Sequence, residues 1–434
     1  MKKINIIGGG LAGVEAASFL ANYGIKVNLY EMKPIKFSPA HKSENLGELV
    51  CSNSLKSNLL TNACGLLKEE MRELGSLTMA AAEASKIEGG SSLNVDRDKF
   101  SEYITQKILQ NPNISVIHEE VTTFKDDEIY IVATGPLGSE DLLNNLRELI
   151  GDDFMSFFDA SAPIIEKDSI NFDIAYYKSR YDEGSASYIN CPMSKEQYYD
   201  FVNELINAET AKLHDFDTKY FEGCMPVEAM AKRGIDTLRY GPLKPKGLWR
   251  GPEDRSFAVV QLRQDTLFGD LYNIVGFQTN LTYPEQKRVF RMIPGLENAK
   301  FIRYGLMHRN SYVNAPKVLN EDMSLKANKN IYLAGQFSGV EGYVESSASG
   351  IYVAIEVLKR LTNLNLEFPK FTMLGSLMNY LNKANPETFA PMNANFGIMY
   401  GVNKSNKLEK ANECIEEVRE FKNKLDEQTR GTIS

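Results

Sequence analysis

The first residues able to do chemistry form a glycine loop near the amino terminus. Gly8-Gly9-Gly10-Leu11-Ala12-Gly13 follows the apolar run Ile4–Ile7 and precedes a predicted helix over Val14–Tyr23. The first glycine permits a tight turn, the third leaves room for a pyrophosphate, and the last lets the helix pack closely on the strand. The amide groups that open a helix, together with the positive end of its dipole, bind phosphate. The loop therefore predicts a dinucleotide site.

An acidic residue follows this loop at the distance that a dinucleotide site requires. Lys26–Tyr30 predicts a second strand, and Glu31 comes directly after it. A carboxylate there can accept hydrogen bonds from the ribose hydroxyls of an adenine dinucleotide. Because strand, glycine loop, helix, strand and acid occur in the expected order, the pattern favours a dinucleotide site over a structural turn.

Two later strand ends favour a flavin over a nicotinamide. Ala133-Thr134-Gly135 follows the predicted strand Ile129–Val132, an arrangement typical of flavoproteins where the chain passes the FAD. Near the end of the chain, the predicted strand Ile331–Leu333 leads into a loop and then a helix, whose amino terminus can face a phosphate or a flavin edge. The expected cofactor contacts in these segments are Gly135, Gly335, Gln336, Gly342 and Tyr343. For the tyrosine, flavin contact and a core-facing helix start remain equal alternatives.

The composition is that of a globular protein in a reducing compartment. The chain has 434 residues, enough for two or three domains, and its formal net charge of −8 argues against a protein that coats nucleic acid. No apolar run approaches membrane-spanning length, and no signal peptide precedes the first strand. Five cysteines and four histidines are scattered without disulfide or metal spacing. We therefore expect a cytoplasmic protein without membrane or metal partners, in which a functional cysteine is a nucleophile.

The order of predicted elements indicates an α/β fold with an insertion. Residues 1–150 form the first part of a Rossmann-like FAD-binding domain, residues 151–296 form an inserted α+β domain, and residues 297–434 complete the first domain and add C-terminal helices. Short strand-like runs recur in the insertion, where a helix is expected over Ser194–Ala208.

Four local expectations can be compared with a structure directly. A helix over Asn62–Ala84 is expected to break near Gly75, and Asp98 is expected to cap a helix over Lys99–Leu109. The segment Gly47–Leu60 shows neither a helical nor a strand period, and we expect a loop with a helical turn. In the insertion, Ala186–Ile189 is one of the predicted strands.

Five segments together carry a specific resemblance. They are the glycine loop, Glu48–Ser57 (ELVCSNSLKS), Phe221–Glu228 (FEGCMPVE), Ile274–Thr279 (IVGFQT) and Ala334–Ser346 (AGQFSGVEGYVES). With them the chain closely resembles the TrmFO family, the folate- and FAD-dependent tRNA (uracil-5-)-methyltransferases of bacteria. The larger MnmG-type flavoproteins share the glycine loop, but this chain is shorter and has both cysteine segments.

The resemblance implies a reaction and its cofactors. FAD receives a one-carbon unit from 5,10-methylenetetrahydrofolate, NAD(P)H supplies reducing equivalents, and the carbon goes to C5 of the tRNA T-loop uridine (position 54). Some mollicute relatives methylate a uridine of 23S rRNA instead, and no motif here selects between the two RNAs. Two other classes stay open: an FAD oxidoreductase acting on a small molecule, and a non-catalytic flavin-bearing RNA-binding factor.

The two cysteine segments supply candidate catalytic residues. Since C5 of uracil is a poor nucleophile, a thiolate must add at C6 before C5 can attack an electrophilic carbon. We predict Cys224 as this nucleophile, because its flanks suggest an exposed turn with Lys232 and Arg233 nearby, and Cys51 in a supporting role such as removal of the C5 proton. The motifs support the pair more firmly than the division of roles. Cys64, Cys191 and Cys414 lie outside them and read as core residues.

A basic run in the insertion is the candidate RNA-binding surface. Residues 232–250 contain six basic side chains and one acid. Such a run is commonly a solvated face, but beside a reactive cysteine it predicts phosphate contacts. The predicted RNA-binding residues are Lys232, Arg233, Lys246 and Arg288.

Overall fold

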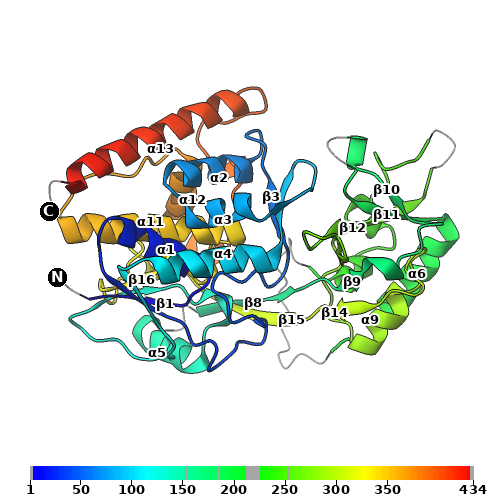
Figure 1. Cartoon of the computed structure of the whole chain (residues 1–434), viewed down its shortest axis with the longest axis horizontal. Helices are drawn as coiled ribbons and strands as arrows, with labels where there is room; N and C mark the ends of the chain where they lie inside the picture. Colours follow the sequence, from blue (N-terminus) through cyan, green and yellow to red (C-terminus); the bar gives the residue numbers. More distant parts are fainter. Residues whose placement is uncertain (1–2, 152–153, 183–185, 212–224, 252–254, 431–434) are drawn as a thin grey trace.

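The computed structural model describes residues 3–151, 154–182, 186–211, 225–251 and 255–430. Figure 1 shows a larger body that contains both ends of the chain and a smaller body built from its middle. Between them runs an antiparallel ladder of β8 (Phe154–Ala160) and β15 (Met307–Val313). Each body has its own cluster of buried apolar side chains.

A parallel sheet of five strands forms the centre of the larger body. Its order is β16 (Ile331–Leu333), β7 (Ile129–Val132), β1 (Ile4–Ile7), β2 (Val27–Tyr30) and β6 (Ile114–Ile117). The strands β1, β7 and β16 are buried along their whole length, which explains their continuous apolar runs. From β1 the chain continues to β2 on one side, whereas β7 lies on the other. Ligands bind beside the carboxyl ends of strands at such a reversal.

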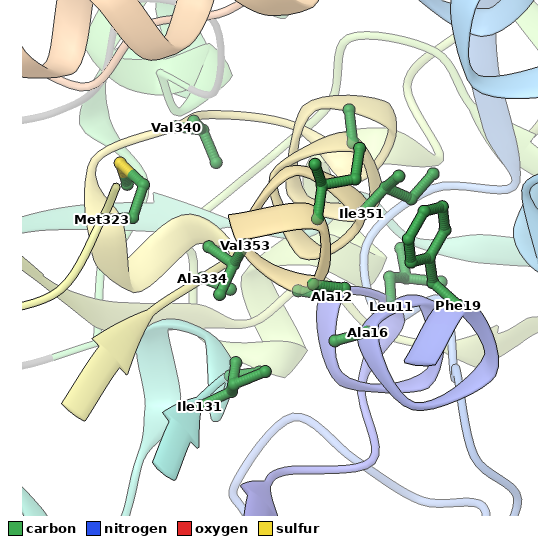
Figure 2. Close-up of a cluster of buried hydrophobic side chains, with 14 of the residues drawn as sticks. Leu11, Ala12, Ala16, Phe19, Ile131, Met323, Ala334, Val340, Ile351 and Val353 are labelled. Atoms are coloured by element: carbon green, nitrogen blue, oxygen red, sulfur yellow. The ribbon is translucent and has the colours of Figure 1, made fainter. Parts of the chain in front are cut away.

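Helices cover this sheet, and two of them approach unusually closely. They are α1 (Leu11–Asn22) and α11 (Tyr343–Thr362), whose side chains meet in the apolar cluster of Figure 2. A Cβ at Gly350 would lie 2.2 Å from the backbone oxygen of Ala12, so the contact needs a glycine there. The other helices of this body are α2 (Ala63–Glu73), α3 (Leu77–Ala84), α4 (Arg97–Gln110), α5 (Glu140–Ile150), α10 (Ala315–Val318), α12 (Met373–Lys383) and α13 (Lys407–Arg430).

The smaller body is an antiparallel sheet with helices on one face. Its strand order is β10 (Tyr176–Tyr177), β11 (Ile189–Met193), β12 (Ala258–Gln264), β13 (Leu271–Ile274), β9 (Ile164–Glu166) and β14 (Phe301–Arg303). The helices are α6 (Lys195–Asn207), α7 (Val227–Lys232), α8 (Thr237–Tyr240) and α9 (Tyr283–Phe290). The sheet extends past residue 296 because β14 pairs with β9. The division of the chain at residues 150 and 296 stays a prediction.

The local expectations are partly right. The helix break is confirmed, since Gly75 adopts a φ of 79° between α2 and α3, and Ser194 caps α6. The cap of α4 is Asp96 rather than Asp98, because the Asp96 Oδ1 accepts hydrogen bonds from the amides of Asp98 and Lys99 at 3.1 Å each.

The structure corrects two expectations, one about a loop and one about a strand. The segment expected as a loop with a helical turn contains β3 (Ser54–Ser57), which pairs with β5 (Ser92–Val95), itself paired with β4 (Lys86–Ile87). Because β3 is stabilised by pairing with a distant segment, its own residues show no alternation of polar and apolar side chains that would predict a strand. The strand expected over Ala186–Ile189 begins only at Ile189, because that is where pairing with β12 starts.

Candidate active site

The glycine loop lies at the carboxyl end of β1, and its glycines differ in their surroundings. A Cβ at Gly8, whose φ is 105°, would lie 2.6 Å from the Ala133 oxygen, and one at Gly13 would lie 1.9 Å from the Gly8 oxygen. A Cβ at Gly10 would have no neighbour closer than 4.0 Å. Two glycines therefore permit close packing, while the third faces open space at the start of α1.

Glu31 holds the loop in place from the end of β2. Its Oε2 accepts a hydrogen bond from the Gly9 amide at 2.9 Å, and its Oε1 accepts one from the Lys33 amide at 3.0 Å. The residue is 7% exposed. The acid expected to bind ribose thus also fixes the turn, a role that its position in the sequence did not reveal.

A cavity of about 450 Å³ opens beside this loop. All of the predicted cofactor contacts line it except Gly9 and Gly13, which lie in the turn and in α1. Within the described chain, no side chain caps the start of α1, and the buried Thr134 Oγ1, on the cavity wall, has no hydrogen-bond partner. Unpaired helix amides, an unpaired hydroxyl and the open space at Gly10 fit the phosphates and polar groups of a dinucleotide.

Cys51 lies in the wall of this cavity, and its backbone is held from the other end of the chain. The amides of Cys51 and Ser52 donate hydrogen bonds to the Tyr343 hydroxyl at 2.6 and 3.1 Å. Tyr343, at the start of α11, lines the same cavity. Burial raises the pKa of Tyr343, and the neighbouring Cys51 adds to this effect. The tyrosine therefore stays protonated and positions the cysteine segment, in addition to facing the cofactor cavity.

Arginines from both bodies surround this segment. Arg263 of β12 donates hydrogen bonds to the Asn53 Oδ1 at 2.9 Å and to the Ser52 Oγ at 2.7 Å. Arg97 of α4 pairs with Asp265 at 2.9 Å and donates to the Leu49 carbonyl at 3.2 Å. Both guanidinium groups interact electrostatically with Cys51. Cations beside a thiol are the setting in which reactive cysteines occur.

Sequence reasoning did not single out these arginines. The partners Arg97 and Asp265 are 168 positions apart, and Arg263 and Asn53 are 210 apart. The one available signal was the density of polar side chains in residues 51–58, which need partners if they are buried.

The remaining described cysteines have different surroundings. Cys64, Cys191 and Cys414 are 7%, 0% and 5% exposed. Burial raises the pKa of the Cys64 and Cys414 thiols to about 12 and raises that of Cys191 as well. These thiols are protonated core groups.

Comparison with known proteins assigns the chain to a family. A family model described as Glucose inhibited division protein A matches residues 3–365. A protein of Caldicellulosiruptor bescii named methylenetetrahydrofolate–tRNA-(uracil-5-)-methyltransferase TrmFO is 56% identical over 400 residues, 92% of each chain. A protein of the same name from Ligilactobacillus salivarius is 50% identical over 429 residues, 97% of this chain and 98% of the relative. The chain belongs to the TrmFO family.

A solved structure supports the fold of this TrmFO family member. GidA of Aquifex aeolicus superposes with a TM-score of 0.69 at 16% identity, covering 98% of this chain and 76% of GidA. Such low identity shows the fold alone. The predicted fold class, a Rossmann-like α/β core with an insertion, is confirmed by this likeness and by the parallel sheet.

The remaining predicted site residues of this TrmFO family member lie in the insertion. Cys224 is outside the described residues. Lys232, Arg233 and Lys246 are exposed. Arg288 forms ion pairs with Glu285 at 2.7 Å and Glu204 at 2.5 Å, so two carboxylates already balance its charge. The lysines are therefore better placed than Arg288 to meet a phosphate.

The basic run is only partly a solvated face. The Arg239 guanidinium lies 3.5 Å from the centre of the Phe257 ring, and that of Arg250 lies 4.9 Å from the centre of the Tyr176 ring.

None of the helices in the described ranges is long and apolar enough to cross a membrane. In the same ranges, no group of three histidines, cysteines or acids is placed to hold a metal ion.

Proposed function

We propose that this chain is a folate- and FAD-dependent methyltransferase that modifies C5 of the T-loop uridine of tRNA. The observation that carries the proposal is the position of Cys51, which lines both the glycine-loop cavity and a second cavity next to the smaller body. A thiol between two cavities suits a reaction in which a carbon held at the cofactor in one cavity is transferred to a uracil ring in the other. The relatives at 50% to 56% identity are named for this reaction on tRNA, which favours tRNA over rRNA.

The first cavity supplies the groups that would hold FAD. The α1 amides would bind the pyrophosphate, Glu31 the ribose, and the loops at Gly135 and Gly335 the remainder of the cofactor. When bound, FAD supplies the redox-active ring that accepts the one-carbon unit of 5,10-methylenetetrahydrofolate. The overall reaction balances when one NAD(P)H is oxidised, because converting a methylene into a methyl group requires two electrons.

The cysteines supply the chemistry at uracil. A Cys224 thiolate adds to C6, which moves the electron pair of the C5–C6 double bond toward O4 and makes C5 nucleophilic. After C5 has bonded to the one-carbon unit, a base removes its hydrogen, the double bond re-forms and the thiolate leaves. Cys51 is the proposed base, because it lies at the wall that the two cavities share. The reaction takes place in the cytoplasm, where tRNA and folate are both present.

Methylation of separate transcripts tests the proposal. Purified protein with FAD, 5,10-methylenetetrahydrofolate and NADH or NADPH is incubated with tRNA or 23S rRNA, and the modified base is mapped. We expect 5-methyluridine in the tRNA T loop. Nicotinamide oxidation that is indifferent to RNA and folate would instead identify an oxidoreductase acting on a small molecule, and RNA binding without modification would identify a binding factor.

Tritium at uracil C5 separates the roles of the two cysteines. Cys224→Ala should keep its FAD and its reduction by NAD(P)H, yet release no tritium, because C5 is not activated without addition at C6. Cys51→Ala should allow addition but slow the loss of the C5 hydrogen. Release at the parental rate by Cys224→Ala, with none by Cys51→Ala, would exchange the two roles.

Salt dependence tests the RNA surface. Replacing Lys232, Arg233 and Lys246 by glutamine together should weaken binding to every RNA sequence and lower the slope of log K against log salt by about 0.7 for each lost single-strand phosphate contact. Arg288→Gln is the matched control, since its charge is already paired, and it should leave the slope unchanged. A triple variant that binds as tightly as the parent at moderate salt would show that the run is a solvated face.

A further inference from the structure

A second cavity, of about 340 Å³, lies between the antiparallel sheet and the Cys51 segment. It shares Cys51, Ser52, Arg263 and Gln278 with the first cavity, so the two spaces adjoin. Its other walls include Asn273 of β13 and Met225, the first described residue after the gap that contains Cys224. Its size falls in the range of small-ligand sites.

The register of the sheet directs two polar side chains toward this cavity. Arg263 of β12 and Asn273 of β13 are directly paired residues, so their side chains lie on the same face. Their neighbours Leu262 and Ile274 form the other face and belong to the apolar cluster of the smaller body. The face toward Cys51 is therefore the polar one.

Asn273 differs from the other amides on this polar face. Asn190 donates a hydrogen bond to the Lys178 carbonyl at 2.8 Å, and Gln261 donates to the Asn190 Oδ1 at 3.1 Å. Asn273 is 3% exposed, yet its Nδ2 has no hydrogen-bond partner among the described residues. A buried amide left without a partner costs free energy, so this donor, on a cavity wall, points to a ligand that accepts its hydrogen bond.

We propose that the second cavity receives the target uracil, everted from the RNA, and that the Asn273 amide pairs with its N3–H and C4=O groups. An amide has an acceptor and a donor side by side, which matches this edge of uracil. Enzymes that modify a base take it out of the stack and read this edge in a pocket. The assignment rests on the proposed methyltransferase function, because that reaction requires a uracil ring next to both Cys51 and the cofactor cavity. A pterin presents the same pair of groups, so the test must distinguish uracil from folate.

Asn273→Leu removes the amide at nearly constant size. We expect this variant to retain flavin and to melt at or above the parent's Tm, since an unpaired buried amide is lost. Its kcat/KM for tRNA methylation should fall about tenfold or more, the usual value of one good amide–base pair. Asn190→Leu is the matched control: it removes an amide that has partners on the same face, and its Tm should fall.

Asn273→Asp tests the base preference. A carboxylate cannot donate to C4=O but can accept from the amino group of cytosine. Tritium release is measured from T-arm RNAs that carry C5-tritiated uracil or cytosine at the target position, and the uracil-to-cytosine ratio should narrow by at least tenfold relative to the parent.

The outcomes separate the two proposals. If the parent modifies tRNA and Asn273→Leu does so with unchanged kcat/KM, the uracil assignment is wrong and the methyltransferase function stands. If Asn273→Leu binds tetrahydrofolate tenfold more weakly at unchanged RNA affinity, the cavity takes the pterin and the uracil assignment fails. A parent that releases tritium from neither RNA and forms no methylated base overturns both proposals.

Discussion

The two cavities that meet at Cys51 are built in different ways. One side of the first consists of glycines at the ends of parallel strands, Gly8, Gly10, Gly135 and Gly335, whose backbone faces the cavity. The second is formed by side chains on the face of an antiparallel sheet, among them Arg263 and Asn273. A site made of backbone depends on short local segments, whereas one made of side chains depends on which strands pair and in what register.

This difference decides what each cavity tolerates. At the glycine loop, a Cβ would overlap backbone at Gly13 but not at Gly10, so we expect the two positions to differ in whether a substituted chain folds. We call the contact between the two bodies at Arg97, Asp265 and Arg263 the junction. These charged side chains are withdrawn from water, so we expect stability there to depend more on the balance of charges and hydrogen bonds than on side-chain volume. Substitutions in each region should therefore fail in different ways.

The largest expected effect is loss of the fold in Gly13→Ala. The new Cβ would lie 1.9 Å from the Gly8 oxygen, a backbone atom that cannot move without opening the turn. We expect a loss of at least about 3 kcal/mol, the upper end of overpacking costs, measured as soluble yield and Tm. Gly10→Ala is the matched control, since its Cβ meets nothing within contact distance. Equal melting of the two variants would refute the close packing of α1 on the turn.

The next effect concerns the side-chain junction. Asp265→Ala leaves Arg97 buried with the Leu49 carbonyl as its one remaining acceptor among the described residues; the Asp265 and Arg97 side chains are 5% and 12% exposed. Breaking a buried pair in this way costs about 3 kcal/mol or more. Urea unfolding followed by fluorescence of Trp249, the one tryptophan, measures the loss. Glu321→Ala breaks an exposed pair with Lys383 and should cost under about 1 kcal/mol. Equal costs would mean that the junction is solvated.

The same contrast explains what the sequence could predict. The glycine loop, Glu31 and the strand ends at Gly135 and Gly335 were located from local spacing, because each lies at the end of its own strand. Asn273 has no such local signal. Its position on the polar face follows from pairing with Arg263 in the neighbouring strand. Arg263 in turn contacts Asn53, which lies 210 positions away in the sequence.

Local errors have similar physical causes. Asp96 and Asp98 are both good helix caps, and only the observed start of α4 at Arg97 decides between them. The strand β3 has a distant partner and contains Lys56 at a positive φ of 61°, which interrupts any regular alternation. Where structure depends on distant pairing, a single sequence carries little information about it.

Gly10→Val should lose the cofactor and keep the fold. Its Cβ would lie no closer than 4.0 Å to any atom beyond its chain neighbours, and the side chain would extend into the cavity at the start of α1, where the pyrophosphate is expected. We expect FAD affinity to fall by about a hundredfold or more, about 2.7 kcal/mol. The visible absorbance of the purified protein measures flavin content, and a Tm near that of flavin-free parent verifies the fold. A yellow Gly10→Val protein with full flavin content would refute the assignment of the cavity.

The smallest expected effect is a pH dependence from His41, a side chain on the wall of the first cavity. Burial, with Lys33 next in effect, lowers the pKa of His41 to about 4 from its ordinary 6.5, while Glu31 opposes the change and Arg303 adds to it. Between pH 6.5 and 4 the unfolded chain binds a proton that the folded chain does not. Stability should therefore fall as the pH falls through this window, by up to about 1.4 kcal/mol per pH unit, and His41→Gln should remove that part of the slope.

Unfolding free energies of parent and His41→Gln at pH 7, 6 and 5 test this expectation. Equal slopes would show that His41 titrates normally and is open to water. If the parent's slope is steeper, His41 is uncharged at neutral pH and adds no positive charge to the first cavity. The groups left to meet an anion there include the amides of α1, which do not titrate, and the side chains of Lys33 and Lys56 on the cavity wall. Binding in the second cavity depends on side chains such as Arg263 and Asn273, whose charge and hydrogen bonding a single substitution can change.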